Sequence, residues 1–436
     1  MLVIYVTLII DNIMNHLQIS RTVNANIQKK INRSIIYHYL CEHDHAYRAK
    51  IAEDLKISAP AVSRAIDKLV ADNFVIEASK IATAKGKKAT RLMVNTEKGI
   101  IIGIDLIKER TRFAISNFKG EIINSYSGFK FYENIDVKKE ISYEVDRIAS
   151  VYNSAKGSGE FSKKLQGICI GIPAVTRDTS GTSISTPLYS SLERTEFIKD
   201  LESIYGVPVY VENIVKLSAL AEKKYGIAKD YKNIIFIEVS NGIGAGIILE
   251  NRLIRGTAGA SGEIGFSIIN TENLNYKTTN NLGFLEKNAS LEGIKKYARE
   301  QIAAGKKSSI SIQSQNDPEK INSSLVCKAA MEGDGVAKEI INRSVQYLSV
   351  CIINLSLCLN PDIVVLGGDI CKLPGIKTLF LDPIAQNMKS IIPFRPPHIN
   401  KSALQDDAGV LGATNLAIEF LIGNYFPYKL SNNSLR

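Results

Sequence analysis

Hydrophobic residues in the first hundred positions recur at the spacing of α-helices. Residues 32–40 and 47–55 each place apolar side chains on one helical face. A tight turn then leads to a third helix, for which Ser58 is the expected N-cap and Pro60 lies in the first turn. Because the third helix has an apolar inner face and a polar outer face, the pattern predicts a helix-turn-helix.

Two short hydrophobic segments follow the third helix. Residues 75–77 and 91–94 predict a pair of strands around a basic, glycine-containing tip at 84–88. Such a hairpin forms a wing that can lie along DNA phosphates or in the minor groove. We therefore predict a winged helix-turn-helix domain over 14–98, and we expect residues 1–13 to be a non-native or unstructured start.

Strand patterns dominate from position 99 onward. Segments at 100–105, 111–117 and 122–127 predict a β-meander, and 233–249 repeat the strand, turn and return strand of that opening. A buried strand at 363–368 then runs into a Gly-rich loop. The repeated opening predicts two α/β lobes.

The lobe boundaries follow from these segments. The first lobe is expected over 99–212, completed by a C-terminal helix at 405–422, and the second over 213–404, with 423–436 as a tail. The N-terminal head is expected to be separate from both lobes, so changes between the lobes are expected to leave its basal DNA affinity intact.

Composition agrees with a soluble globular chain. The 436 residues are 45% hydrophobic and 22% charged, which suits two or three domains. No segment approaches the ~18 to 20 consecutive apolar residues of a membrane-spanning helix, so no membrane partner is expected. The six cysteines contain no Cys-x-x-Cys pair, which argues against a disulfide scaffold or zinc finger and favours the cytoplasm.

The net charge of +10 is concentrated in the head. Up to Lys98 there are 15 Lys and Arg against 9 Asp and Glu, whereas the rest of the chain has 39 against 35. A basic surface of this kind suits phosphate backbones, although a solvated Lys-rich surface or a protein contact is the alternative. Helix geometry and charge together favour operator DNA as the partner. The predicted DNA-binding residues are Ser58, Ala61, Ser63, Arg64 and Lys68 on the third helix and Lys85, Lys87 and Lys88 at the wing tip.

Six motifs resemble those of the ROK family, which groups bacterial sugar kinases with sugar-responsive repressors. They are Ile-Ser-Ala-Pro-Ala-Val-Ser-Arg at 57–64, Gly-Ile-Pro at 171–173, Val-Glu-Asn at 211–213, Ser-Asn-Gly-Ile-Gly-Ala-Gly at 240–246, Gly-Ala-Ser-Gly-Glu-Ile-Gly at 259–265 and Ala-Gly-Val-Leu-Gly-Ala at 408–413. The resemblance covers about 30–422. It implies a winged helix followed by a two-lobed, actin-like fold of the sugar kinase and Hsp70 type, a small-molecule sugar effector, and a homodimer or higher homo-oligomer.

Two departures from the family kinases argue against catalysis. The kinases carry an Asn-Asp pair in which the Asp is the catalytic base, and here the pair reads Asn213-Ile214. An isoleucine side chain accepts no proton, so the general-base contribution to phosphoryl transfer is lost. The first phosphate hairpin, 105–111, also lacks the family's glycines. We therefore expect no catalytic residue, and ATP binding is doubtful.

The family's structural zinc site is also altered. Its His corresponds to Phe266, and its Cys-rich segment reads without cysteine over 277–286. None of these side chains replaces a thiolate or imidazole. We expect no metal and no cofactor, with Phe266 and Phe284 filling the space of the ion and the loop with Lys277 and Thr279 held by packing.

The resemblance assigns Asn213, Glu263 and Glu286 to sugar hydroxyls. The alternative is that the two glutamates only satisfy nearby backbone amides. The leading hypothesis is a DNA-binding repressor whose inactive kinase-like part senses a neutral sugar between its lobes. The rivals are an ATP-dependent sugar kinase with a DNA-binding head, and a DNA-binding protein whose kinase-like part is pure scaffold.

Overall fold

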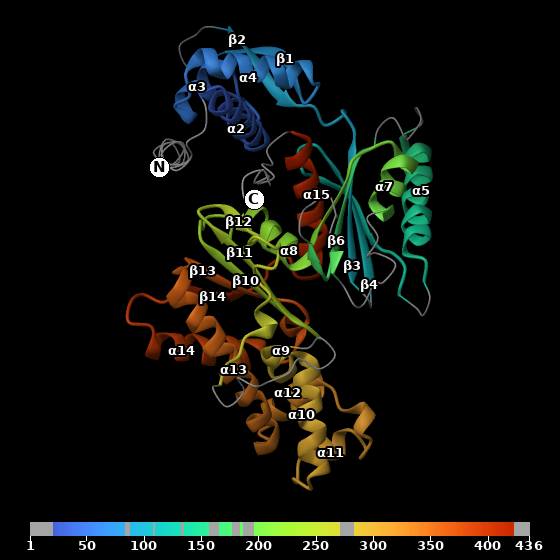
Figure 1. The fold of residues 1–436 in the computed structure, drawn as a ribbon, viewed down its shortest axis with the longest axis vertical. Coiled ribbons are helices and arrows are strands. Elements are labelled where there is room, and N and C mark those ends of the chain that lie inside the picture. Colours follow the sequence, from blue (N-terminus) through green and yellow to red (C-terminus); the bar gives the residue numbers. More distant parts are fainter. Residues whose placement is uncertain are drawn as a thin grey trace, which may run out of the picture.

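Two five-stranded sheets of the same design form the body of the molecule (Figure 1). In each sheet an antiparallel meander of three strands is extended by two parallel strands. The structure, a computed structural model, describes residues 21–82, 88–107, 110–131, 135–156, 165–176, 184–185, 196–270 and 283–422. The repeated sheets confirm the predicted actin-like architecture of two lobes.

The first sheet has the strand order β5-β4-β3-β6-β9. Its strands are β3 (Ile100–Ile107), β4 (Arg110–Asn117), β5 (Ile122–Ser127), β6 (Leu165–Ile172) and β9 (Val209–Asn213). The helices α5 (Val137–Lys156) and α7 (Glu196–Tyr205) pack on one face, and a short pair, β7 (Val175–Thr176) and β8 (Ile184–Ser185), lies beyond β6. The first lobe thus contains the β-meander that the sequence predicts.

The second sheet has the strand order β12-β11-β10-β13-β14. Its strands are β10 (Ile234–Val239), β11 (Ile243–Leu249), β12 (Arg252–Ile254), β13 (Ile363–Gly367) and β14 (His398–Lys401). The helices of this lobe are α9 (Phe284–Ala289), α10 (Leu291–Ala303), α11 (Ser309–Gln313), α12 (Ser323–Met331), α13 (Gly335–Leu359) and α14 (Asp382–Ile391). Short helical turns are η2 (Ile264–Phe266), η4 (Pro318–Lys320), η5 (Asp369–Lys372), η6 (Ile376–Leu381) and η7 (Gln405–Asp407).

The N-terminal head is a winged helix, as predicted. It consists of α2 (Arg21–Glu42), α3 (Arg48–Leu55), α4 (Ala59–Ala71), β1 (Val75–Ala82) and β2 (Lys88–Val94). The strands β1 and β2 pair antiparallel and are longer than the sequence pattern predicts, and α2 begins at Arg21. The apolar face of α4 is buried, as its helical spacing predicts.

The start of α4 differs in one detail from the expectation. Ser58 occupies the N-cap position, but its hydroxyl accepts no hydrogen bond from the first helical amides. Its backbone carbonyl instead accepts hydrogen bonds from the amides of Ala61 and Val62 at 2.9 and 3.0 Å. Lys56 makes the preceding turn in the left-handed region, at φ 51°. The exposed Ser58 hydroxyl is therefore not used to cap the helix.

The chain crosses between the lobes twice, and one buried carboxylate ties the crossings together. The first crossing runs through α8 (Ile214–Lys224), and the second leads through η7 into α15 (Ala408–Leu421). Both helices lie between the two sheets (Figure 1). Glu222 of α8 is fully buried and accepts hydrogen bonds from the Ser402 hydroxyl and the Leu404 amide, the latter at 3.0 Å. Movement of one crossing therefore affects the other.

The head shares an apolar core with the first lobe, which corrects the expectation of a separate head. Tyr37 of α2 and Phe74 lie in the same buried cluster as Phe118 and Ile418. The rings of Phe74 and Phe118 meet edge to face at 5.4 Å, and the Tyr37 hydroxyl donates to the Phe118 carbonyl. The helix α2 lies between α4 and the first lobe, which leaves α4 on the outer side of the head (Figure 1).

One described helix, α13, has the length and composition of a membrane span. Its most apolar window is 56% buried inside the second lobe. A core helix of a soluble protein has the same features, so this helix is weak evidence for a membrane.

Candidate functional sites in the head and between the lobes

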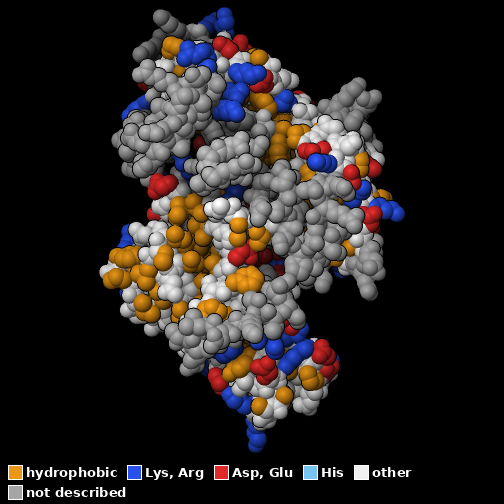
Figure 2. Space-filling view, viewed as in Figure 1, with side chains coloured by type: hydrophobic (Ala, Val, Ile, Leu, Met, Phe, Trp, Pro, Cys, Tyr) orange, Lys and Arg blue, Asp and Glu red, His pale blue; other side chains and the backbone are white. Residues whose placement is uncertain are grey.

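The outer face of α4 presents the residues that sequence reasoning assigned to DNA. Ser58, Arg64 and Lys68 are exposed, while Ala61 and Ser63 are half-buried. The first half of α4 therefore offers small side chains, hydroxyls and one free-standing guanidinium to a groove. Figure 2 shows several basic side chains on the described part of the head, beside acidic and hydrophobic ones.

Lys68 and Lys88 differ in whether a carboxylate lies beside the ammonium group. Lys68 donates to Asp72, one helical turn later, at 2.6 Å, so part of its charge is already neutralised. Lys88 is exposed at the start of β2. Lys85 and Lys87 lie outside the described residues. Of the predicted DNA-binding residues that the structure describes, Arg64 and Lys88 are thus the basic side chains that stand exposed without a carboxylate partner in the described part of the head.

Sequence reasoning missed the residue that braces the helix-turn-helix. Arg48, at the start of α3, donates to the Asp67 carboxylate at 2.7 Å, to Glu77 at 2.9 Å and to the Ser63 carbonyl at 3.2 Å. It thereby links α3, α4 and β1 with one guanidinium. No sequence signal marks these pairs, because the partners are up to 29 residues away.

Asn213 works as a helix cap. It ends β9 and precedes α8, and its side-chain oxygen accepts hydrogen bonds from the Val215 and Lys216 amides at 2.9 and 3.3 Å. Its Nδ2 donates to the Ala174 carbonyl at 3.0 Å, and the residue is only 7% exposed. Both ends of the amide have protein partners, so a contact from Asn213 to a sugar remains a prediction.

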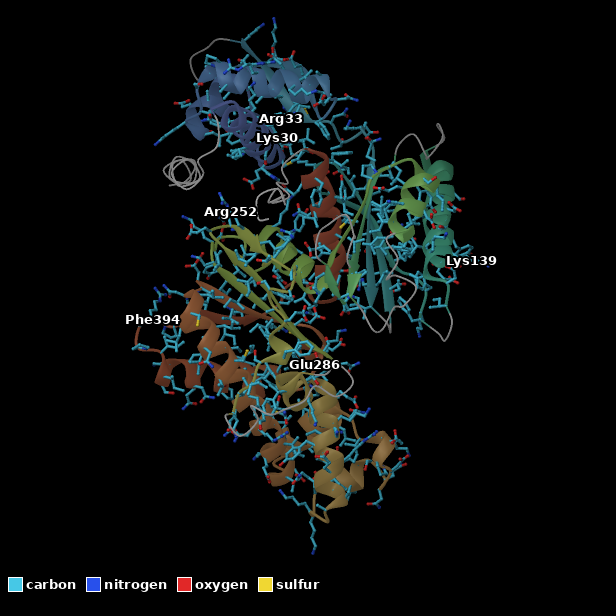
Figure 3. The ribbon with its side chains drawn as sticks, viewed as in Figure 1. Lys30, Arg33, Lys139, Arg252, Glu286 and Phe394 are labelled. Atoms are coloured by element: carbon cyan, nitrogen blue, oxygen red, sulfur yellow. The ribbon has the colours of Figure 1, made fainter. Side chains whose placement is uncertain are left out.

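Glu263 and Glu286 lie close enough to influence each other. Burial raises the pKa of Glu263, and the ammonium of Lys216 opposes this shift. Burial likewise raises the pKa of Glu286, which the Ile243 amide lowers and Glu263 raises further. One Glu286 oxygen accepts the Ile243 amide at 2.9 Å, so the alternative of backbone satisfaction applies to this oxygen. Figure 3 shows Glu286 beside α9, below the second sheet.

A buried ionic cluster adjoins this pair, and sequence reasoning missed it. Glu212 accepts the Asn213 amide at 2.9 Å and the Arg255 guanidinium at 2.7 Å. Lys216 donates to the carbonyl of Gly259. Glu212 and Lys216 are each 1% exposed, which is rare for these residue types and gives no sequence signal. We call the region of Glu212, Asn213, Lys216, Arg255, Glu263 and Glu286 the interlobe junction.

Ile214 fills the position of the kinase base with hydrocarbon. Its side chain is buried against Gly171 and Gly409, and a Cβ on either glycine would lie 2.4 Å from its Cδ1 atom. Such tight contact leaves no room for a substrate hydroxyl at this point. The position that the family resemblance assigns to the base is therefore occupied by a buried, closely packed hydrocarbon side chain.

Acidic side chains gather where β10, η5 and η7 meet. Lys372 binds Asp369 at 2.7 Å and Asp406 at 2.6 Å, and Glu238 of β10 lies near both carboxylates. Burial, Asp369 and Asp406 raise the pKa of Glu238 to about 7. On the first-lobe side, Arg112 pairs with Asp407. Three carboxylates around one ammonium make this region acidic, which disfavours phosphate groups that carry no cation.

The residues at the family's zinc position do not fit the metal. Phe284 is buried and meets the Tyr347 ring edge to face at 5.7 Å. Phe266 is 46% exposed, so the expectation that it fills the space of an ion is wrong. Lys277 and Thr279 lie outside the described residues. Among the residues that the structure describes, no group of three or more His, Cys, Asp or Glu could hold a metal ion.

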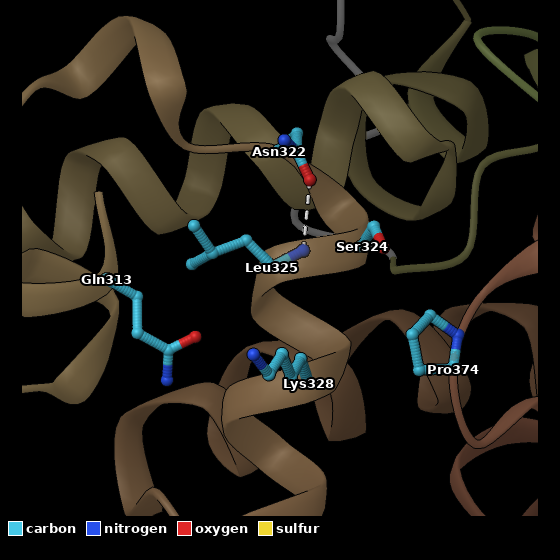
Figure 4. Close-up of a pocket in the computed structure, with 6 residues that line it drawn as sticks. All are labelled: Gln313, Asn322, Ser324, Leu325, Lys328 and Pro374. Carbon is cyan, nitrogen blue, oxygen red and sulfur yellow. Dashed lines mark hydrogen bonds between the residues drawn. The ribbon is translucent and has the colours of Figure 1, made fainter.

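An open pocket of about 470 Å³ lies elsewhere in the second lobe (Figure 4). Asn322 and Lys328 line it, and Asn322 caps α12 by accepting the Leu325 amide at 2.9 Å. None of the predicted site residues lines this pocket. It therefore lies apart from the interlobe junction.

The molecule thus combines a winged-helix head with a two-lobed, sugar-kinase-like body that lacks the base of a kinase. The ROK family model matches residues 101–419, and the chain belongs to the ROK family.

Three similar proteins show both branches of this family. A xylose repressor from Caldicellulosiruptor bescii is 28% identical over 408 residues, which cover 93% of this chain and 99% of the relative. A ROK family transcriptional regulator, a homolog of the Escherichia coli MLC protein, superposes with a TM-score of 0.76 at 22% identity, covering 91% of this chain and 97% of that chain. A ROK family glucokinase from Streptomyces griseus, in complex with glucose and AMPPNP, gives 0.57 at 22% identity, covering 73% and 99%.

The comparisons differ in how much of the chain they cover. The regulator covers nearly the whole chain, whereas the kinase covers about three quarters of it. The repressor relative also matches along nearly its entire length. The prediction of a sugar-responsive, DNA-binding repressor of the ROK family is confirmed at this level.

Proposed function

We propose that the head of this repressor reads operator DNA through α4 and the wing, and that a neutral sugar bound at the interlobe junction changes the DNA affinity. The observation that carries the proposal is the half-buried carboxylate pair of Glu263 and Glu286, in a body with Ile214 at the kinase base position. Carboxylates accept hydrogen bonds from sugar hydroxyls, while two negative charges disfavour a phosphorylated sugar. Asn213 completes the proposed sugar contacts.

The first sugar to test is xylose. The relative from Caldicellulosiruptor bescii, which matches over nearly its full length, is named a xylose repressor. The interlobe junction offers hydrogen-bond acceptors and donors from both lobes, and these groups suit the hydroxyls of a polyol. Hexoses and amino sugars are therefore included as competitors.

Two helices connect the proposed sugar site with the head. The helix α8 begins at the junction, and Lys224 near its end donates to Asn415 of α15. Farther along α15, Glu419 pairs with His38 of α2 at 2.7 Å. A ligand that binds one arrangement of the lobes better than another shifts the population of that arrangement. The shared core of head and first lobe would then carry the shift to α4.

The same proposal covers the state of the protein in the cell. We place it in the cytoplasm as a homodimer or higher homo-oligomer, because a two-fold operator is matched by a two-fold protein. We also propose that it is not a kinase. Ile214 and the acidic groups around Lys372 support this part of the proposal.

Operator binding in the presence and absence of sugar tests the function. In a gel-shift titration with DNA from upstream of its own gene, xylose is expected to change the apparent Kd by about 5- to 150-fold, the usual range of allosteric coupling. A thermal-shift screen of sugars run in parallel reports binding without DNA. If DNA binds but no sugar changes either measurement, the scaffold rival is correct.

A coupled assay of ADP release tests the kinase rival. With ATP, Mg²⁺ and the same sugars, no turnover is expected above the level without protein, because the base and the phosphate cradle are missing. Sustained turnover that a substitution at Glu263 abolishes would establish a sugar kinase instead.

A further inference from the structure

Two charged contacts join the lobes directly beside the carboxylate pair. Glu212, on β9 of the first lobe, binds Arg255, which follows β12 of the second lobe. Lys216, in the first turn of α8, donates to the carbonyl of Gly259. Both second-lobe partners belong to the loop at 255–262 that leads into Glu263.

This loop has little conformational preference of its own. Gly256, Gly259 and Gly262 all have positive φ angles, of 71°, 71° and 93°. Its internal hydrogen bonds are few and include the Ser261 amide to the Arg255 carbonyl at 2.9 Å. Glycines in such conformations are permissive and leave a loop with high entropy in the absence of outside contacts. The position of Glu263 therefore depends on what holds the loop.

Lys216 is an unusual choice for a purely structural contact. The side chain is 1% exposed, and burying an ammonium is costly compared with burying an apolar residue of the same size. Glu212, Arg255 and Glu263 all act on its charge, and burial together with Arg255 lowers its pKa. A hydrophobic residue would pack here at a lower desolvation cost. Packing alone therefore does not explain why a lysine occupies this position.

We propose that Lys216 is a positioning residue for sugar sensing: it crosses from α8 to the second lobe and, through the Gly259 carbonyl, holds the loop that leads into Glu263. This inference rests on the proposed sugar binding at the junction. The charged groups that act on Glu263 are Lys216 from α8 and Glu286 from α9. Among the described residues, Lys216 is the charge that lowers the pKa of Glu263, so its removal leaves the effect of burial, which favours the neutral carboxyl.

The first measurement is hydrogen exchange in the ligand-free protein. In Lys216→Met, which keeps length and loses charge, the amides of residues 256–262 are expected to exchange about 10-fold faster or more, because the loop has lost the outside contact at its centre and keeps only those near its two ends, Arg255 to Glu212 and the Ala245 amide to the Gly262 carbonyl. Lys216→Arg, which keeps the donor, is expected to restore protection. Lys229→Met is the matched control, since Lys229 is exposed and lies beyond the end of α8.

The second measurement is xylose affinity by calorimetry at pH 6, 7 and 8. In Lys216→Met the Kd is expected to rise about 10-fold at pH 8 and further at pH 6, because Glu263 then takes up a proton more readily. The wild type and Lys216→Arg are expected to change little over this range. Glu263→Gln combined with Lys216→Met should remove the added pH dependence, which a merely structural role of Lys216 would not predict.

Several results would overturn the inference. Unchanged loop exchange, or unchanged affinity and pH profile in a folded Lys216→Met protein, contradicts it. If this variant does not fold, Lys216→Gln replaces it: faster exchange of the amides of residues 256–262 supports the inference, and unchanged exchange refutes the positioning of the loop by Lys216. If the wild type binds no sugar, the proposed function fails, while the exchange measurement still decides whether Lys216 holds the loop.

Discussion

The two interfaces of the first lobe differ in what accompanies their apolar packing. The head meets this lobe through a continuous apolar core around Tyr37, Phe74 and Phe118, whereas between the lobes the apolar packing of α8 is joined by buried charges such as Glu212 and Lys216. Apolar contact is non-directional and keeps one close-packed arrangement. A charged side chain can exchange a hydrogen bond with the protein for one with a ligand hydroxyl. In the proposed function, the interface between the lobes therefore rearranges when the sugar binds, and the interface between head and first lobe stays intact and transmits the change.

The largest effect is expected from breaking the apolar interface. Phe118→Ala removes a fully buried ring between head and first lobe and should destabilise the protein by about 3 to 5 kcal/mol. Chemical unfolding measures this loss. If the interface carries the signal, DNA binding should persist while its response to sugar is reduced. Phe394→Ala, at an exposed site of the second lobe (Figure 3), is the control, expected within about 0.5 kcal/mol of wild type.

The outer face of the head offers the next effect. Arg64→Ala should weaken operator binding by about 1 to 3 kcal/mol and relax its sequence preference, whereas Lys88→Ala should weaken binding to any DNA and flatten the salt dependence. Gel shifts at several salt concentrations separate the two outcomes. Lys328→Ala, on α12 at the far end of the molecule, serves as control (Figure 1). Equal affinity of all three variants would refute the DNA assignment of α4 and the wing.

The acidic region around Lys372 should make stability depend on pH. A carboxyl with a raised folded-state pKa stabilises the fold fully below its unfolded pKa, and the contribution is lost as the pH rises. For Glu238 the window runs from the usual value of 4.5 to about 7. Glu238→Gln should remove a decline in stability on the order of 2 kcal/mol across this window. Thermal unfolding between pH 4.5 and 8 would show the variant and wild type with parallel curves if Glu238 contributes nothing.

Substitutions at Asn213 and Glu263 should distinguish a loss of stability from a loss of sugar binding at the interlobe junction. Asn213→Ala removes the cap of α8 and should cost about 1 kcal/mol of stability. Glu263→Ala leaves that cap intact and should abolish the sugar-induced thermal shift while basal DNA affinity stays close to wild type. Because α8 runs from the junction toward the head, Asn213→Ala is now expected to alter DNA binding as well, in contrast to the expectation for a separate head. Retained sugar binding in both variants would place the ligand elsewhere.

Local sequence patterns predicted much of the fold. Helical spacing located α3 and α4, short strand-like segments located β3, β4 and β5, and the repeated opening indicated the second lobe. These elements follow from residues within one or two turns or one hairpin of each other, where propensity and burial agree. The resemblance to the family kinases placed Ile214 at the position of the kinase base, since a change of residue type within a matched motif is visible without coordinates.

Tertiary structure alone decided how the functional groups are used. Nothing local in the sequence shows that Lys216 reaches Gly259, that Glu212 reaches Arg255, or that Asn213 caps α8 while it also binds Ala174. Such pairs join residues up to about 40 positions apart, and the choice between partners depends on which surfaces the fold brings together and removes from water. The sequence by itself therefore determined the kinds of chemistry available to this protein, and burial between the lobes determined which of those groups face a ligand and which support the fold.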